Sequence, residues 1–161
     1  MSVTIETIGV IRTPFTQRSG MPIQGPLTPR YAGRVEVNPA WEGGLKDIEG
    51  FSHIILLYLF HQAGVCDRMH VKPFMDDHEH GIFAVRSPLR PNPIGLTTVR
   101  LVGREEATLF VEGVDMLDGT PLIDIKPYLA KVDAHPGATS GWAREGLEDA
   151  TRHISDDRFG G

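Results

Sequence analysis

The stretch FSHIILLYLF at residues 51–60 is the starting point for predicting the fold. All of its residues except Ser52 and His53 are apolar. A short, nearly continuous apolar run of this kind indicates a strand that is buried on both faces. We therefore expect residues 51–60 to form such a strand.

Further strand signals lie on both sides of this run, with turn residues between them. The segments predicted as strands are residues 3–12, 33–37, 81–86, 96–102, 107–114 and 121–125. Several short strands, together with eighteen glycines and twelve prolines in 161 residues, predict a mainly β domain, either a compact barrel or a sandwich.

One helix is predicted, at residues 142–153, with Thr139 or Ser140 as its N-cap. Its apolar stripe is thin, so we expect it to pack on the surface or on a partner. No G-x-G-x-x-G turn joins a strand to a helix, which argues against a Rossmann dinucleotide or methyltransferase fold.

Composition narrows the class of protein further. A chain of 161 residues, 40% hydrophobic and 23% charged, predicts one soluble globular domain. No apolar run approaches the roughly 20 residues that cross a bilayer, so no membrane partner is expected. The single cysteine, Cys66, fits a reducing cytoplasm.

The charge distribution indicates the type of ligand. A net charge of −5 argues against a generic nucleic-acid binder. Four arginines and no carboxylate nevertheless lie within residues 80–104. Two of them belong to RSPLRPNPIGL, residues 86–96, where three prolines leave the chain little freedom. A stiff, positively charged loop suits a discrete anionic substrate.

We expect four polar, turn-rich segments to meet at one rim of the fold. They are GMPIQ (residues 20–24), YLFHQ (58–62), the proline-rich loop (86–96) and DMLDGTPLIDIKPY (115–128). Sites usually lie in such loops on a rigid scaffold.

Individual residues in these segments have two interpretations. His61 is either a ligand contact or a histidine hydrogen-bonded to backbone. Asp118 is either functional or part of an Asx-turn before Gly119. Asp115, at the expected rim, is the better-placed ligand contact. Lys126 can instead form an ion pair with Asp124 or Asp118.

His78 and His80, two residues apart, would share a face of a strand and could bind a metal. A third ligand at convincing spacing is missing, so no metal site is predicted.

Five stretches in sequence order carry a family resemblance: IGVIRTPF, PIQG, GFSHIILLYLFHQ, GIFAVRSPLRPNPIGLT and DMLDGTPLIDIKPY. Together they resemble the TrmO family, also called TsaA-like or YaeB-like, of S-adenosylmethionine-dependent tRNA adenine-N6 methyltransferases. The resemblance implies a small single-domain β-barrel over residues 1–130, followed by a helical tail over residues 131–161. It also implies a homodimer.

The reaction that the resemblance implies is methylation of N6 of threonylcarbamoyladenosine, next to the anticodon in the tRNA anticodon loop. By motif, the residues implied to bind the cofactor S-adenosyl-L-methionine are Pro22, Ile23, Gln24, Phe60, His61, Arg86, Leu96, Gly113, Val114 and Asp115.

The chemistry of methyl transfer suggests roles for the remaining polar residues. Asp118 is the first candidate for a base that takes the N6 proton, and Asp115 is the second. Arg90, with Lys126, is expected to bind an RNA phosphate or the threonylcarbamoyl carboxylate. Two alternatives stay open: a methyltransferase with another substrate, and a non-enzymatic barrel that binds adenosylmethionine or RNA.

Overall fold

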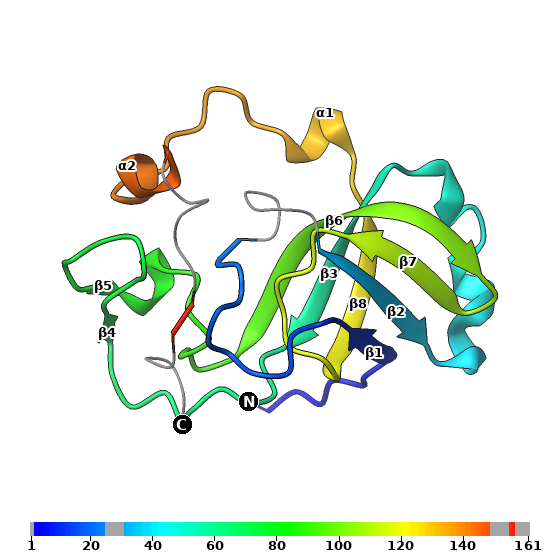
Figure 1. Cartoon of the computed structure of the whole chain (residues 1–161), viewed down its shortest axis with the longest axis horizontal. Coiled ribbons are helices and arrows are strands. Elements are labelled where there is room, and N and C mark those ends of the chain that lie inside the picture. The colour runs from blue at the N-terminus through cyan, green and yellow to red at the C-terminus, as the bar shows by residue number, and fades with distance from the viewer. Residues whose placement is uncertain (1, 25–30, 149–154, 157–161) are drawn as a thin grey trace.

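Six antiparallel strands form a closed barrel in the computed structural model, which describes residues 2–24, 31–148 and 155–156 (Figure 1). Around the barrel the strands follow the order β1, β2, β7, β6, β3 and β8, and β8 pairs with β1 to close it. Their bounds are β1 (Gly9–Arg12), β2 (Ala32–Val37), β3 (His53–Leu59), β6 (Ile94–Glu105), β7 (Thr108–Glu112) and β8 (Thr120–Pro127). This architecture confirms the predicted mainly β, non-Rossmann barrel.

Shorter elements lie outside the barrel. They are the strands β4 (His70–Val71) and β5 (His80–Gly81), the 3₁₀ helices η2 (Pro39–Leu45), η3 (Ile48–Gly50) and η4 (Ile82–Ala84), and the α-helices α1 (Ala130–Asp133) and α2 (Ala143–Glu148). Figure 1 shows β4, β5 and α2 on one side of the molecule and the barrel on the other. Within the described part of the chain, no helix combines the length and apolar character needed to cross a membrane.

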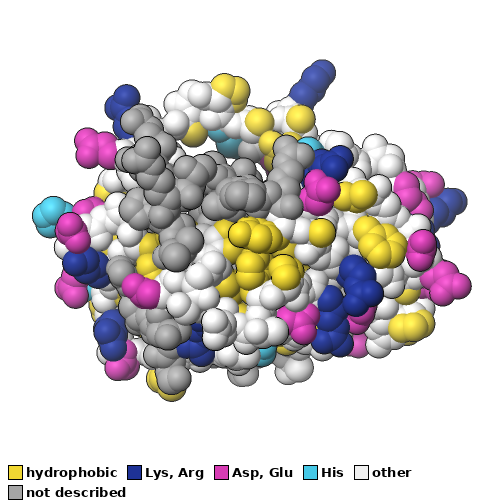
Figure 2. Space-filling view, viewed as in Figure 1, with side chains coloured by type: hydrophobic (Ala, Val, Ile, Leu, Met, Phe, Trp, Pro, Cys, Tyr) yellow, Lys and Arg dark blue, Asp and Glu magenta, His cyan; other side chains and the backbone are white. Residues whose placement is uncertain are grey.

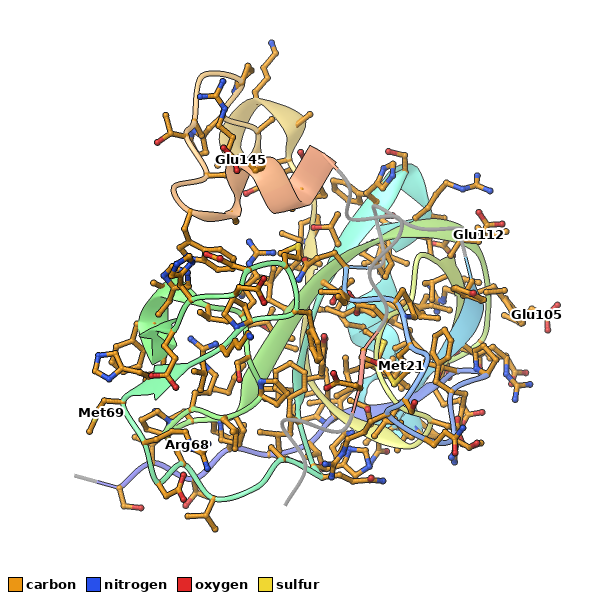
Figure 3. All side chains as sticks on the ribbon, turned by 60° about the vertical axis from the view of Figure 1, so that its left-hand side comes forward. Met21, Arg68, Met69, Glu105, Glu112 and Glu145 are labelled. Carbon is orange, nitrogen blue, oxygen red and sulfur yellow. The ribbon has the colours of Figure 1, made fainter. Side chains whose placement is uncertain are left out.

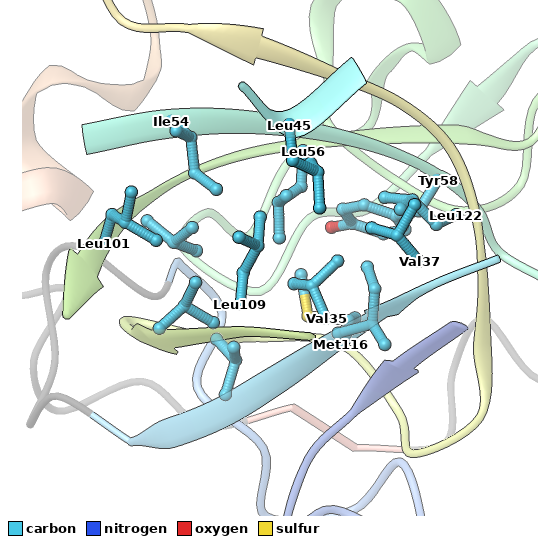
Figure 4. Packing of buried hydrophobic residues seen from close by; sticks show 14 residues of the cluster. Val35, Val37, Leu45, Ile54, Leu56, Tyr58, Leu101, Leu109, Met116 and Leu122 are labelled. Carbon is cyan, nitrogen blue, oxygen red and sulfur yellow. The ribbon is translucent and has the colours of Figure 1, made fainter. Parts of the chain in front are cut away.

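The barrel interior is filled by alternate side chains of its strands (Figure 4). Ile54 and Leu56 of β3, Val35 of β2 and Leu109 of β7 are completely buried there. Fully burying each such side chain contributes on the order of 2 kcal/mol to stability. The interior is therefore a packed core, and any ligand site must lie at its end or outside it.

The expectation that β3 is buried on both faces was wrong. Ile54, Leu56 and Tyr58 point inward and are buried, whereas Ile55 and Leu57 alternate with them and are only half-buried. The reason is geometric, because a closed barrel has a single inner face and successive side chains point to opposite faces. The apolar residues on the outer face of β3 are thus left partly exposed.

Two predicted strands are much shorter than expected. The first begins at Gly9, which pairs with Val37, because beyond Val37 the partner chain turns at Asn38 into η2. In the second, only His80–Gly81 is extended, and η4 follows. A 3₁₀ turn places residues three apart on one side, so Ile82 and Val85 are buried together.

These two residues belong to a small second core beside the barrel, formed by Val71, Ile82, Val85 and Leu89. Trp142 packs against it just before α2. The predicted helix over residues 142–153 is thus observed as α2 (Ala143–Glu148), and residues 149–154 lie outside the described part of the chain. The tail is therefore anchored to the second core.

Candidate functional site

A cavity of about 970 Å³ lies between the end of the barrel, the second core and the C-terminal segment. All four of the segments that were expected to meet at one rim contribute to its lining. Apolar and polar groups are mixed in it, with apolar groups in excess. A cavity of this size, with a few polar side chains on largely apolar walls, is typical of a small-molecule site.

Most of the residues predicted to bind a cofactor or substrate line this cavity. Those on its walls are Pro22, Ile23, Gln24, Phe60, His61, Arg86, Arg90, Leu96 and Asp115. They come from segments as far apart in sequence as residues 22 and 115. The barrel brings them together because β3, β6 and β8 are adjacent and their ends meet at this side.

Four predicted residues do not line the cavity. Val114 is completely buried in the barrel core, and Gly113, at a φ of 94°, directly follows β7 and precedes it. Lys126 lies on the exposed part of β8, where its Nζ is 2.7 Å from Asp124 Oδ2. This is one of the two ion pairs that the sequence suggested for Lys126 as an alternative to a ligand contact.

Asp118 is the fourth of these residues, and its carboxylate is engaged on the far side of the turn. Its Oδ1 accepts a hydrogen bond from the Thr13 backbone N–H at 3.0 Å, and its Oδ2 lies 3.8 Å from Arg12 Nη1. Gly119 follows at a φ of 77°, as a turn requires. Asp118 thus ties the loop after β1 to the turn before β8.

The arginines of the proline-rich loop have different surroundings. Arg90 Nη1 donates to the backbone carbonyls of Val85 and Ser87, at 3.1 and 3.2 Å, so this side chain braces the loop from within. Arg86 is exposed, and its Nη1 donates to Gln24 Oε1 at 3.3 Å, and both residues line the cavity. Arg86 is therefore the better-placed of the two to meet an anionic group of a ligand.

Asp115 is the carboxylate of the cavity wall that is held by buried partners. Its Oδ1 accepts from Thr97 Oγ1 at 2.7 Å and from Tyr58 Oη at 3.5 Å, and the two hydroxyl oxygens are 3.0 Å apart. Burial and the nearby Asp115 charge raise the pKa of Tyr58 well above its usual value. The phenol therefore stays protonated and serves as a hydrogen-bond donor.

Sequence reasoning missed one whole wall of the cavity, which the C-terminal segment supplies. Trp142 and Leu147, together with Ser155, lie on it. Ser155 exchanges backbone hydrogen bonds with the loop after β1: its N–H donates to Met21 O, and its carbonyl accepts from Gly20 N–H, both at 2.9 Å. The thin apolar stripe noted in the sequence was the available signal, since it predicted a surface contact.

We call residues 139–147 together with 155–156 the C-terminal strap. It is anchored at Trp142, whose indole stacks on the His80 ring at 4.5 Å and whose Nε1 donates to Ala84 O at 2.9 Å. Figure 3 shows Met21 in the middle of the molecule and Glu145 at its outer edge with α2. The strap therefore spans from the second core to the loop after β1.

The pair His78 and His80 is engaged with a carboxylate. Asp76 Oδ2 lies 2.7 Å from His80 Nε2, and its Oδ1 lies 3.1 Å from His78 Nδ1. These two hydrogen bonds, from His80 first, lower the pKa of Asp76. Among the described residues, no three His, Cys, Asp or Glu side chains are grouped so as to hold a metal ion. The cluster instead supports the ring on which Trp142 stacks.

The cavity thus offers three chemically distinct surfaces. Phe60, Trp142 and Met116 supply apolar and aromatic contacts suited to a planar ring. Arg86 supplies positive charge at one side, and Asp115 supplies negative charge at the barrel end. Such an arrangement fits a ligand that carries an aromatic ring together with groups of both charges.

Comparison with known families gives one match that covers most of the chain. The model of the "tRNA-methyltransferase O N-terminal domain" family matches residues 10–134. The matched range includes all six barrel strands apart from Gly9, the first residue of β1. It ends at residue 134, before the C-terminal strap.

Individual relatives agree with this match. A "Probable S-adenosyl-L-methionine-binding protein" of Pyrococcus abyssi (strain GE5 / Orsay) is 43% identical over 159 residues, which is 99% of this chain and 86% of the relative. A human "tRNA (adenine(37)-N6)-methyltransferase" is 36% identical over 137 residues, which is 80% of this chain but 31% of the human protein.

A solved structure, described as TrmO from Pseudomonas aeruginosa, superimposes with a TM-score of 0.75 at 39% identity. The superposition covers 89% of this chain and 63% of the Pseudomonas chain. The barrel described above is thus shared with a protein of experimentally determined structure.

Proposed function

The chain belongs to the tRNA-methyltransferase O N-terminal domain family, and on that premise we propose that it is an S-adenosyl-L-methionine-dependent tRNA methyltransferase. The proposed acceptor is N6 of the adenosine next to the anticodon, carrying a threonylcarbamoyl group. The names of the human and Pyrococcus relatives support methyl transfer to tRNA and binding of the methyl donor, respectively. The observation that carries the proposal is that all four predicted segments line the same cavity.

The methyl donor fits the chemistry of the cavity walls. It carries an adenine ring, a carboxylate and two positive groups, the ammonium and the sulfonium. We assign the ring to the apolar walls near Phe60 and Leu96, with Pro22, Ile23, Gln24 and His61 completing the contact surface. Arg86 is assigned to the carboxylate, since a guanidinium binds a carboxylate through two parallel hydrogen bonds.

The proposed reaction is an in-line displacement. The N6 lone pair forms a bond to the methyl carbon, the carbon–sulfur bond breaks with its electron pair moving to sulfur, and the N6 proton passes to Asp115 or to water. Alignment of donor and acceptor supplies most of the rate gain in such a step. A loop stiffened by three prolines and by Arg90 keeps this alignment without a new ordering cost.

Asp115 replaces Asp118 as the carboxylate proposed to act in the site. Asp118 is occupied by Thr13 and Arg12 away from the cavity, whereas Asp115 lines it. Asp115 has two possible roles: to take the N6 proton, or to accept hydrogen bonds from the methyl donor.

The proposed anionic substrate group, an RNA phosphate or the threonylcarbamoyl carboxylate, is assigned to Arg90, which lines the cavity. Lys126 lies on β8 outside the cavity and is no longer proposed to contact it. We further propose that the protein acts in the cytoplasm, which the single cysteine supports.

A homodimer is also proposed, and the outer face of β3 supports it. Ile55, Leu57 and Leu59 point outward from β3, and Leu57 pairs with Leu96 of β6, which is 52% exposed. On the face that Figure 2 shows, positive and negative side chains are interspersed around smaller apolar groups. A second copy seated on this apolar face would lie beside the mouth of the cavity, because Leu96 also lines it.

Two measurements test the proposed function. Calorimetry with S-adenosylmethionine is expected to show one site per chain. Mass spectrometry of tRNA nucleosides from a deletion strain is expected to show loss of the N6-methyl form of threonylcarbamoyladenosine, restored by the wild-type gene. Donor binding with unchanged tRNA nucleosides would point to another substrate or a non-enzymatic binder, and absence of donor binding would overturn the cofactor assignment.

A further inference from the structure

Two buried hydroxyl groups that the proposed reaction does not use lead directly to Asp115. Tyr58 of β3 and Thr97 of β6 are diagonal neighbours on paired strands, since Tyr58 pairs with Gly95 and Thr97 with Leu56, and they are 3% and 4% exposed. Each hydroxyl has one hydrogen to donate. The short contact from Thr97 to Asp115, at 2.7 Å, uses the hydrogen of Thr97.

The direction of the remaining contact follows from this count. Since Thr97 gives its hydrogen to Asp115, the one hydrogen of Tyr58 has two acceptors within reach, Thr97 Oγ1 at 3.0 Å and Asp115 Oδ1 at 3.5 Å, and Thr97 Oγ1 is the nearer. The chain of hydrogen bonds therefore runs from Tyr58 through Thr97 to Asp115 Oδ1. Hydrogen bonds aligned in one direction inside a protein strengthen one another.

Burial and the nearby Asp115 charge keep the phenol of Tyr58 protonated, so it has a hydrogen to donate. Packing holds the ring in place as well. A Cβ on Gly95, which pairs with Tyr58, would lie 2.2 Å from the ring carbon Cε2. The glycine of the N-P-I-G motif thus leaves room for the first donor of the chain.

A carboxylate that accepts hydrogen bonds is stabilised in its charged form. The two hydroxyl contacts also hold the carboxylate of Asp115 in one orientation on the cavity wall. We propose that Tyr58 and Thr97 are positioning residues that hold Asp115 as a fixed anion, and that Asp115 binds a positive group of the methyl donor and does not take the N6 proton. The inference rests on the proposed function, because that function supplies the cationic ligand.

The test separates cofactor affinity from turnover. Thr97→Val keeps the side-chain shape and removes the donor, and Thr97→Ser restores it. Thr97→Val is expected to weaken S-adenosylmethionine binding about tenfold in calorimetry, as loss of a hydrogen bond to a charged group does. Thr97→Ser is expected to bind within about twofold of wild type.

At saturating cofactor, kcat on tRNA and its dependence on pH are expected to be unchanged in Thr97→Val. The matched control is Thr108→Val, a strand threonine of β7 that does not line the cavity, and we expect wild-type behaviour from it. Should Thr97→Val fail to fold, Tyr58→Phe removes the upstream donor while keeping the ring, with an expected loss of about threefold in cofactor affinity.

Two results would overturn the inference. One is a cofactor affinity in Thr97→Val equal to that of wild type. The other is a fall in kcat, with its acid limb displaced, at unchanged affinity, because that is the signature of Asp115 as a base. A wild-type protein that binds the donor without methylating tRNA would instead refute the tRNA substrate alone. Absence of donor binding would refute both the proposed function and the inference about Asp115.

Discussion

Gly95 has no side chain because the ring of Tyr58 occupies the space that a side chain would fill. A Cβ there would meet three ring carbons within 2.9 Å. We expect Gly95→Ala to lower the free energy of unfolding by about 2 kcal/mol, since overpacking a core forces neighbouring groups out of their preferred positions. Urea denaturation measures this, and calorimetry should show weaker donor binding because the displaced ring no longer donates to Thr97.

The same strand offers a matched control for this change. A Cβ on Gly103 of β6 would have no neighbour within 4 Å, and its φ is not positive. We expect Gly103→Ala to leave stability within about 0.5 kcal/mol of wild type. Equal losses in the two variants would mean that backbone freedom, and not the Tyr58 ring, accounts for the effect.

The raised pKa of Tyr58 predicts a dependence of stability on alkaline pH. In the unfolded chain the phenol ionises near pH 10, whereas in the folded protein it stays neutral to higher pH. Its contribution to stability is therefore complete below pH 10 and is lost as pH rises toward the folded-state pKa, by up to about 1.4 kcal/mol per pH unit.

Urea midpoints of wild type and Tyr58→Phe between pH 8 and pH 11 measure this contribution, because the other ionising groups are common to both proteins. We expect the wild-type midpoint to fall more steeply above about pH 10. Parallel curves would show that Tyr58 is accessible to solvent in the folded state.

At the scale of elements, the C-terminal strap is anchored by Trp142 through the stack on His80 and the hydrogen bond to Ala84 O. We expect Trp142→Ala to release α2 and to weaken donor binding about threefold, because one wall of the cavity is lost. Hydrogen exchange should become faster in residues 143–148 and stay unchanged in the barrel strands.

The control for the strap is Trp41→Ala. Trp41 is 48% exposed in η2 and does not line the cavity, so this variant should keep wild-type exchange in α2 and wild-type affinity. Unchanged exchange in Trp142→Ala would instead mean that the contacts of Ser155 with Met21 are enough to hold the strap.

The elements also show where sequence reasoning succeeds and where it stops. The barrel strands were predicted because alternation and apolar runs are local signals. The extent of β1 was not predicted, because Asn38 ends its partner strand by turning into η2. Asp115 was identified by its place after a strand, whereas Thr97 is an ordinary strand threonine whose role depends on the pairing of β6 with β3.

At the scale of the whole molecule, the proposed dimer predicts a change in mass on altering the outer face of β3. Wild type is expected to have twice the chain mass of 17.7 kDa in analytical ultracentrifugation. We expect Leu57→Lys to be a monomer, because it places a charge in the proposed interface. The fold should tolerate it, since Leu57 is next to Asp124 of β8 and the new ammonium can pair there.

Val132→Lys provides the comparison. Val132 is a 63% exposed residue of α1, and this variant should keep the wild-type mass. An unchanged mass in Leu57→Lys would exclude the β3 face as the interface, and a monomeric wild type would exclude the dimer itself.

The backbone hydrogen bonds between Ser155 and the loop after β1 have a consequence for how the protein is made. Every barrel strand is translated before residue 128, so pairing of the strands does not depend on Ser155. The loop at Gly20 and Met21 must then wait for Ser155 to emerge. A newly made chain should therefore pass through a stage with a finished barrel and an unfinished binding cavity, and a premature stop codon after β8 would leave it permanently at that stage.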